Sequence, residues 1–210
     1  MPVAFNDPRL VAPQCTNLHP VRTVHQNPWF SVRNRGGYYT TEYAQPQVIV
    51  LPVVNNRAVV LVRVKRPVIM ESTLELPAGG AKAEESPRQG AARELSEETG
   101  IQAPAERFRE MLPIANSPNR NPQLIHIFQV DLQQQEYDRR GAHDHEIDEV
   151  VLYNFEEIAA KIFKGEIFVG VPLAILSRFL LEHVRSPNPY KTESVDACAK
   201  PDLKATGQTT

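Results

Sequence analysis

The sequence predicts an α/β (α+β mixed-sheet) fold, in which one sheet is flanked by helices. Strand-like apolar runs and helix-like segments alternate along the 210 residues, and no segment is repeated. Some neighbouring runs are separated by tight turns, which join antiparallel strands, whereas others are separated by a helix, which joins parallel strands. Because both kinds of connection occur in one chain, we expect a mixed sheet.

The N-terminal part predicts an arm followed by a small β extension. Residues 1–24 are rich in proline and lack helical periodicity, so we expect an arm there. Residues 29–33 and 38–43 have the composition of strands and lie on either side of a turn at 35–37 that contains two glycines. We therefore assign residues 1–44 to an N-terminal arm and β extension.

The main domain is expected to open with two strands and a glycine loop. Residues 47–54 form a nearly continuous apolar run, which is typical of a strand buried on both faces. Residues 57–65 return as a second strand after a turn at Asn55 and Asn56. Residues 74–80 then predict a short strand that runs into the glycine loop.

A helix is predicted next, over residues 86–99. Ser86 suits the N-cap because its hydroxyl can accept a hydrogen bond from the first turn. Pro87 suits the first helical position, where no backbone N–H is needed, and Gly100 suits the end of the helix.

The rest of the domain continues the alternation of strands and helices. Strands are predicted at 107–115, 124–130 and 149–154, a short helix begins at 155–158, and an amphipathic helix spans 171–183. The polar segment 133–145 is expected to be mobile, and residues 186–210 have the composition of a disordered tail. We therefore place the main domain at residues 45–185 and the tail at 186–210.

The composition of the chain indicates which partners and which cellular compartment to expect. The formal net charge of -2 does not favour a stable nucleic-acid partner. Cys15 and Cys198 lie near opposite ends of the chain, so they suggest neither a disulfide framework nor a metal site. The start of the chain lacks a signal-peptide pattern, and the apolar stretch at 48–54 is too short to cross a bilayer. We expect a cytoplasmic protein with no membrane partner.

Three glutamates share one face of the helix predicted at 86–99. Glu94, Glu97 and Glu98 are spaced i, i+3 and i+4, so their carboxylates converge. Like charges at this spacing repel by about 0.2–0.5 kcal/mol per pair. One interpretation is a solvated acidic face. The other is a platform for a hard cation such as Mg²⁺, which binds carboxylate oxygens together with substrate phosphates.

The spacing around these glutamates resembles the Nudix hydrolase box, Gly-x5-Glu-x7-Arg-Glu-U-x-Glu-Glu-x-Gly-U, where U is aliphatic. Every specified position is filled, by Gly79, Glu85, Arg93, Glu94, Leu95, Glu97, Glu98, Gly100 and Ile101. The resemblance implies a Nudix-type α/β/α sandwich. It also implies hydrolysis of a nucleoside diphosphate linked to another moiety, with Mg²⁺ or Mn²⁺ as the cofactor.

The resemblance assigns roles residue by residue. The positions that match the family's metal ligands are Glu94, Glu97, Glu98 and the backbone of Gly79. Arg93 matches a residue that pairs with carboxylates of the box, and Glu85 is its expected partner.

Segments outside the box are similar to the ADP-ribose pyrophosphatase branch of the family. Glu75 begins a Glu-Leu-Pro-Ala-Gly lead-in, and Arg66 occupies a position where that branch often carries an arginine near the substrate. The branch also has a marker proline after the box; here Pro118 lies one position beyond that spacing, close to Arg120. The resemblance implies that a nucleotide sugar, ADP-ribose first, is cleaved to AMP and ribose 5-phosphate, with these four residues as substrate-binding candidates.

Two other functions remain open from the sequence. One is hydrolysis of a GDP-sugar or a dinucleoside polyphosphate by the same box. The other is a Nudix-fold nucleotide sensor that has no catalytic activity. The complete set of box glutamates favours an enzyme over a sensor.

The general base and the assembly state are expected to depend on segments outside the box. In the family branch, a glutamate on a later loop often accepts the proton from the attacking water. Glu146 is the first candidate for this catalytic role and Glu149, expected at the start of a strand, is the second. The branch commonly dimerises through its N-terminal strands, so we expect a homodimer.

Overall fold

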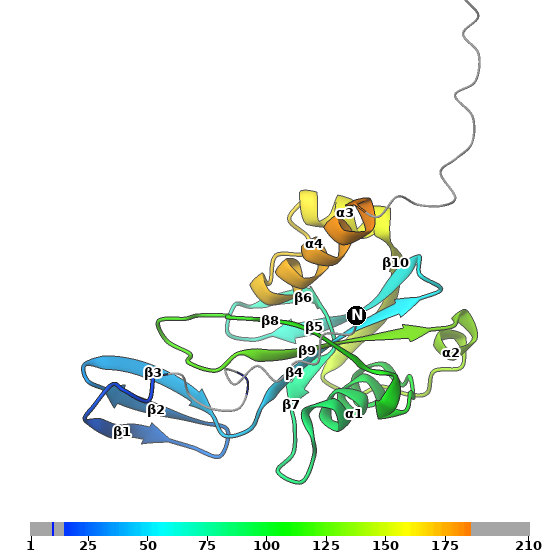
Figure 1. The fold of residues 1–210 in the computed structure, drawn as a ribbon. Coiled ribbons are helices and arrows are strands. Elements are labelled where there is room, and N and C mark those ends of the chain that lie inside the picture. The colour runs from blue at the N-terminus through cyan, green and yellow to red at the C-terminus, as the bar shows by residue number, and fades with distance from the viewer. Residues whose placement is uncertain (1–9, 11–14, 186–210) are drawn as a thin grey trace, which may run out of the picture.

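The computed structural model describes residue 10 and residues 15–185 of the chain (Figure 1). The predicted C-terminal tail and most of the predicted N-terminal arm lie outside the described residues. The strands are β1 (Val21–Gln26), β2 (Phe30–Arg35), β3 (Tyr38–Tyr43), β4 (Gln47–Val54), β5 (Ala58–Arg66), β6 (Glu71–Glu75), β7 (Ala78–Gly80), β8 (Arg109–Ile114), β9 (Ile125–Leu132) and β10 (Ile147–Asn154). The α-helices are α1 (Pro87–Thr99), α2 (Gln134–Asp138), α3 (Phe155–Phe163) and α4 (Gly170–Arg185).

A three-stranded antiparallel sheet, in the order β1-β2-β3, forms the N-terminal extension and projects from the main domain (Figure 1). The hairpin between β2 and β3 turns at Gly36 and Gly37, which both have positive φ, as the glycine pair predicts. The prediction of an arm up to residue 24 was wrong for β1, which begins at Val21. β1 gave no strand signal because five of its six side chains are exposed, so apolar and polar residues do not alternate along it.

The large sheet is mixed, as predicted. Its main path runs β10-β5-β4-β9-β8, with β4 and β9 parallel and the other neighbours antiparallel. β4 pairs with β5 only at Val53 and Val54. Beyond that point β6 pairs with β5 and β7 pairs with β4. Residues 75–80, which lead into the box at Gly79, therefore lie between the separated parts of β4 and β5.

Helices cover both faces of the large sheet (Figure 1). The side chains of β4 alternate between the two cores, which confirms that this strand is buried on both faces. Val48 and Val50 pack with Leu95 of α1 on one face. Ile49 and Leu51 pack with the apolar side chains of α3 and α4 on the other face. The fold is therefore an α/β/α sandwich.

The box helix α1 has the boundaries that its capping residues predict. The Ser86 hydroxyl accepts a hydrogen bond from the Gln89 backbone N–H, and the Gln89 side chain accepts one from the Ser86 N–H, which makes a capping box. Pro87 occupies the first turn, and Gly100 ends the helix with a φ of 70°.

The segment 133–145 is more ordered than its polar composition suggests. It contains α2, whose N-terminus is capped by Gln133 and Glu136. Arg107 also binds Glu136, through two hydrogen bonds of 2.6 and 3.1 Å. These contacts come from distant parts of the chain, so local polarity could not predict them. Among the described residues, no helix has the length and apolar character needed to cross a membrane.

Candidate active site

The box lies where β7 meets α1. β7 pairs with the start of β4, and α1 packs across this pair, so the glycine loop and the helix face each other. Gly79 lies directly against the carboxylate of Glu94, and a Cβ atom at Gly79 would overlap that carboxylate. Glycine is required at this position because the Glu94 carboxylate approaches its backbone so closely.

Arg93 is the centre of the hydrogen-bond network in the box. Its Nε donates to both carboxylate oxygens of Glu85, at 3.0 and 3.1 Å, so the expected pairing is present. Its Nη1 lies 2.6 Å from Glu97 Oε2 and 2.9 Å from Glu94 Oε1. Its Nη2 donates to the backbone oxygen of Gly80 at 2.8 Å. Arg93 therefore links the glycine loop to the acidic face of α1.

The carboxylates of the box differ in their electrostatic environments. The backbone N–H of Lys82 and the guanidinium of Arg93 lower the pKa of Glu85. Burial raises the pKa of Glu94, although Arg93 opposes this effect. Glu97 is the exposed member of the set, and Lys82 Nζ lies 3.7 Å from its Oε1.

Glu98 is the most strongly perturbed carboxylate of the site. Burial raises its pKa to about 8, while a hydrogen bond from the Ala78 backbone N–H acts in the opposite direction. That bond is 3.0 Å long and ends on Glu98 Oε2. The negative charge of Glu94 raises the pKa further. A cation close to both carboxylates would relieve this unfavourable charge.

The donor atoms of the box suit a hard divalent cation because all of them are oxygens. Among the described residues, no group of three or more His, Cys, Asp or Glu side chains is arranged around a common metal position. Instead, the guanidinium of Arg93 contacts Glu94 and Glu97. The box carboxylates thus fit a metal by their chemistry, and cationic side chains neutralise part of their charge in the structure.

A second ion pair lies beside Glu98. Arg66, at the end of β5, donates from Nε and Nη2 to the two carboxylate oxygens of Glu75, at 2.7 and 2.8 Å. The Thr73 hydroxyl also donates to Glu75, at 2.6 Å. Glu75 raises the pKa of Arg66 through this hydrogen bond, and the nearby charges of Glu98 and Glu146 add to the effect. The structure therefore brings Arg66, Glu75 and Glu146 close to the box.

The loop that carries Glu146 is attached to the C-terminal end of α1. The Gly141 N–H donates to the Gly100 oxygen at 2.9 Å, and the Asp144 N–H donates to the Glu97 oxygen at 2.8 Å. Glu146 itself is exposed, in the turn just before β10. Glu149 lies within β10, where its Oε2 is 3.2 Å from Arg63 Nε on the neighbouring strand. Of the two candidates for the base, only Glu146 lies on a loop next to the box.

Pro118 and Arg120 lie in the loop between β8 and β9. The contacts of Arg120 go to β3: its backbone oxygen accepts from the Thr41 N–H at 2.7 Å, and its Nη1 donates to the Tyr39 oxygen at 3.3 Å. This loop thus attaches the N-terminal extension to the main domain.

Two polar contacts of the site were absent from the sequence-based prediction. Lys82 occupies a variable position of the box, so the motif gives no sign of its ion pair with Glu97. Thr73 precedes Glu75 by two residues on β6, and this spacing places both side chains on one face of a strand. The period of the strand could therefore have identified Thr73.

Comparison with known proteins places the chain in a family. The chain is 35% identical over 81 residues to the "Methanol dehydrogenase activator" of Bacillus methanolicus, a match that covers 39% of this chain and spans 43% of the length of that relative. A solved structure described as "Crystal structure of ADP compounds hydrolase" matches the fold with a TM-score of 0.60, at 18% identity, over 80% of this chain and 92% of the other. The model of the NUDIX domain matches residues 44–169, which is more than half of the chain. With the complete box and the α/β/α fold around it, the chain belongs to the NUDIX domain family.

Proposed function

We propose that this protein is a metal-dependent Nudix pyrophosphohydrolase that cleaves ADP-ribose to AMP and ribose 5-phosphate. The observation that carries the proposal is the meeting of three groups at one place: the box carboxylates of α1, the Arg66–Glu75 pair, and the loop of Glu146. Together they offer ligands for a cation, a positive charge beside it and a carboxylate that can accept a proton.

The metal ligands in this proposal are Glu94, Glu97, Glu98 and the backbone of Gly79. A divalent cation, Mg²⁺ or Mn²⁺, would supply positive charge that offsets the phosphate oxygens and makes water a stronger acid. Two features of the chain support this assignment. Burial raises the pKa of Glu94 and Glu98 even though Arg93 pairs with Glu94, so a further cation beside them would be favourable. Gly79 leaves space for the carboxylate of Glu94 beside the loop backbone.

The protein's own residues would position the reacting groups. Arg93 holds Glu85, Glu94 and Glu97 in fixed relation to the glycine loop. Arg66 is oriented by the two oxygens of Glu75, and its charge would pair with a phosphate group of the substrate. Glu75 thus acts through Arg66 in this proposal. Pro118 and Arg120 would shape the substrate site from the β8–β9 loop.

Glu146 would act as the general base. Its carboxylate would take the proton from the attacking water as the water's oxygen bonds to one phosphorus, while the bond from that phosphorus to the bridging oxygen breaks and the bridging oxygen leaves with the other phosphate, giving AMP and ribose 5-phosphate. Such a step typically contributes about 10²–10⁴-fold to the rate. Glu146 is exposed and near Arg66, whereas Glu149 is engaged with Arg63. We retain Glu149 as the second candidate.

A substrate panel tests the proposal. The full chain is incubated with Mg²⁺ and, in separate reactions, ADP-ribose, a GDP-sugar and a dinucleoside polyphosphate, and the products are separated by ion-exchange chromatography. We expect AMP and ribose 5-phosphate from ADP-ribose, at a higher rate than products of the other two. Faster cleavage of another compound would reassign the substrate. Saturable binding of ADP-ribose with no product from any compound would identify a sensor.

A further inference from the structure

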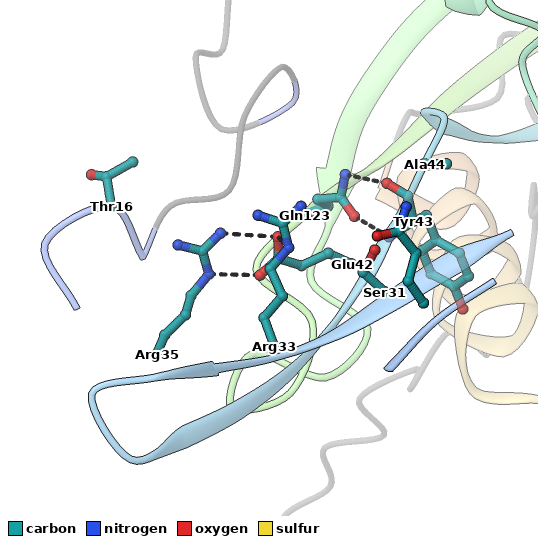
Figure 2. Close-up of a pocket in the computed structure, with 9 residues that line it drawn as sticks. Thr16, Ser31, Arg33, Arg35, Glu42, Tyr43, Ala44 and Gln123 are labelled. Atoms are coloured by element: carbon teal, nitrogen blue, oxygen red, sulfur yellow. Dashed lines mark hydrogen bonds and ion pairs between the residues drawn. The ribbon is translucent and has the colours of Figure 1, made fainter. Parts of the chain in front are cut away.

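A polar pocket lies away from the box, on the N-terminal extension. Its volume is about 520 Å³, which is within the usual range for small-molecule sites. Its walls come from Thr16, β1, β2, β3, the β3–β4 connection and the β8–β9 loop, and Figure 2 shows Arg33 and Arg35 turned toward Glu42. None of the box residues is among the residues that line it.

The pocket wall carries a charged row where a small sheet would ordinarily bury apolar side chains. Ser31, Arg33 and Arg35 alternate along β2 and therefore share one face. Glu42 of β3 is the register partner of Ser31 of β2, so its side chain lies on that same face. Arg35 and Glu42 are both buried, with 7% and 6% of their surfaces exposed. Buried ion pairs are weak contributors to stability, so folding alone does not explain this row.

The charges in the row do not cancel. Arg35 donates to both oxygens of Glu42, at 2.6 and 3.0 Å, and the Thr40 hydroxyl donates to Glu42 Oε1 at 2.8 Å. The carboxylate is thereby occupied. Arg33 Nε is 3.5 Å from Glu42 Oε2 and, within the described part of the chain, this buried nitrogen has no hydrogen-bond partner. Two guanidinium groups against one carboxylate leave one net positive charge in the wall.

Arg33 remains accessible from the pocket, since 38% of its side chain is exposed compared with 8% for Arg35. A guanidinium that is partly desolvated and incompletely paired is a strong site for a carboxylate or phosphate group. The side chain of Gln123, on another wall, is already bonded to the backbone N–H and oxygen of Tyr43, at 2.8 and 3.2 Å. These bonds fix the wall and leave Arg33 as the charged group available to a ligand.

We propose that this pocket binds a small organic anion, whose phosphate or carboxylate group is held by Arg33 while the Arg35–Glu42 pair fixes the surrounding wall. The volume of the pocket is far larger than an inorganic ion needs, and it accommodates a molecule of about the size of a nucleoside monophosphate. The site is separate from the box, so its existence does not depend on the proposed hydrolase activity.

Binding is measured by isothermal titration calorimetry with the full chain in EDTA, so that the acidic box, without metal, repels anions. The probes are AMP for a phosphate group, citrate for carboxylates and uncharged adenosine as the control. Trp29 provides a second readout, because it is the single tryptophan and its backbone oxygen accepts from the N–H of Ala44, a pocket residue. We expect saturable binding of AMP or citrate, accompanied by a change in Trp29 fluorescence, and at least ten-fold weaker binding of adenosine.

Matched variants separate the pocket from general electrostatic attraction. Arg33→Gln is expected to weaken anion binding about ten-fold or more, because a charge-assisted bond is lost. Arg22→Gln removes the same charge from the same sheet, but Arg22 pairs with Asn34 and lies on the opposite face, so binding should stay within two-fold. Arg33→Lys keeps the positive charge but loses the paired N–H donors of the guanidinium. Its affinity for the anion should therefore lie between those of the wild type and Arg33→Gln.

Three results would overturn the proposal. They are the absence of saturable binding of either anion, adenosine binding as tight as that of AMP, and equal weakening by Arg22→Gln and Arg33→Gln. Arg66→Gln serves as a control for binding at the box, because it removes the positive charge beside Glu98 and leaves the pocket residues unchanged. A loss of AMP binding in Arg66→Gln would likewise overturn the proposal by moving the site to the box.

Discussion

Glu97 is the box carboxylate most open to solvent, and substituting it tests the metal assignment with little effect on folding. Glu97→Gln should retain the fold and lose most hydrolytic activity, because an amide is a much poorer ligand for Mg²⁺ than a carboxylate. Glu84→Gln, which changes an exposed glutamate at a variable position of the box in the loop before α1, is the control and should remain active. Circular dichroism checks the fold, and steady-state rates with saturating Mg²⁺ check the activity. Activity of Glu97→Gln within a few-fold of wild type would contradict the assignment.

The two candidate bases make opposite predictions at the residue scale. Glu146→Gln should lower kcat by about 10²-fold or more with KM nearly unchanged, because a base acts in the transition state and not in binding. Glu149→Gln should change kcat little, since Glu149 is engaged with Arg63 on the sheet. Steady-state kinetics of both variants decide the matter. If Glu149→Gln alone is inactive, the second candidate is the base; if both variants are active, neither is.

At the scale of the element, the glycines of β7 differ in what surrounds them. Gly79→Ala should displace the carboxylate of Glu94, because a Cβ atom there would overlap it. A Cβ atom at Gly80 would approach only the end of the Gln47 side chain, at 3.4 Å. Gly80→Ala is therefore a matched control one residue away. We expect Gly79→Ala to lose far more activity than stability and Gly80→Ala to keep both. Equal activities of the two variants would show that the position of Glu94 has no role in the reaction.

The C-terminal end of α1 offers a second comparison between glycines. Gly100 and Gly165 have similar left-handed backbones, with φ of 70° and 74°, so alanine at either costs about 1–2 kcal/mol. A Cβ atom at Gly100 would also overlap the backbone of Gly141, whereas nothing lies within 4 Å at Gly165. Gly100→Ala should therefore be the more destabilising change and should also lower activity by displacing the loop of Glu146. Urea unfolding and rate measurements on both variants check this; similar unfolding midpoints would contradict it.

The sequence predicted elements best where local chemistry decides their limits. Ser86, Pro87 and Gly100 define α1 by capping, which operates within a few residues. β1 and α2 were not predicted because their order depends on partners far along the chain, such as β2 for β1 and Arg107 for α2. In the candidate site, the box spacing identified Arg93 and its bond to Glu85, because the two residues lie in one continuous motif. The bond of Glu98 to Ala78 joins two elements and required the structure.

At the scale of the whole molecule, the N-terminal extension presents unpaired apolar surface. Trp29, Tyr38 and Tyr39 are 73%, 55% and 49% exposed on or beside a small sheet with open edges. Such surface is typical of an interaction site, so we predict a homodimer that uses this sheet. Light scattering should give a mass near twice the 23.6 kDa of one chain.

A pair of variants locates that dimer interface. Trp29→Ala should weaken the dimer, whereas Phe163→Ala, which removes another exposed aromatic side chain from α3 of the main domain, should not. A monomer mass for the wild type at micromolar concentration would contradict the prediction of a dimer. Equal dissociation of the two variants would contradict the choice of surface.

The two hydrogen bonds between the end of α1 and the loop before β10 involve only backbone atoms. Helix ends leave carbonyl oxygens without partners inside the helix, and here two such oxygens, of Glu97 and Gly100, set the spacing between the acidic helix and the following loop. Side chains at positions 141–145 can therefore be exchanged without altering this spacing, provided that the main chain keeps its path. The amino-acid sequence of this loop is therefore expected to vary among related chains while its length stays the same. Insertions and deletions in the loop should lower activity more than substitutions do.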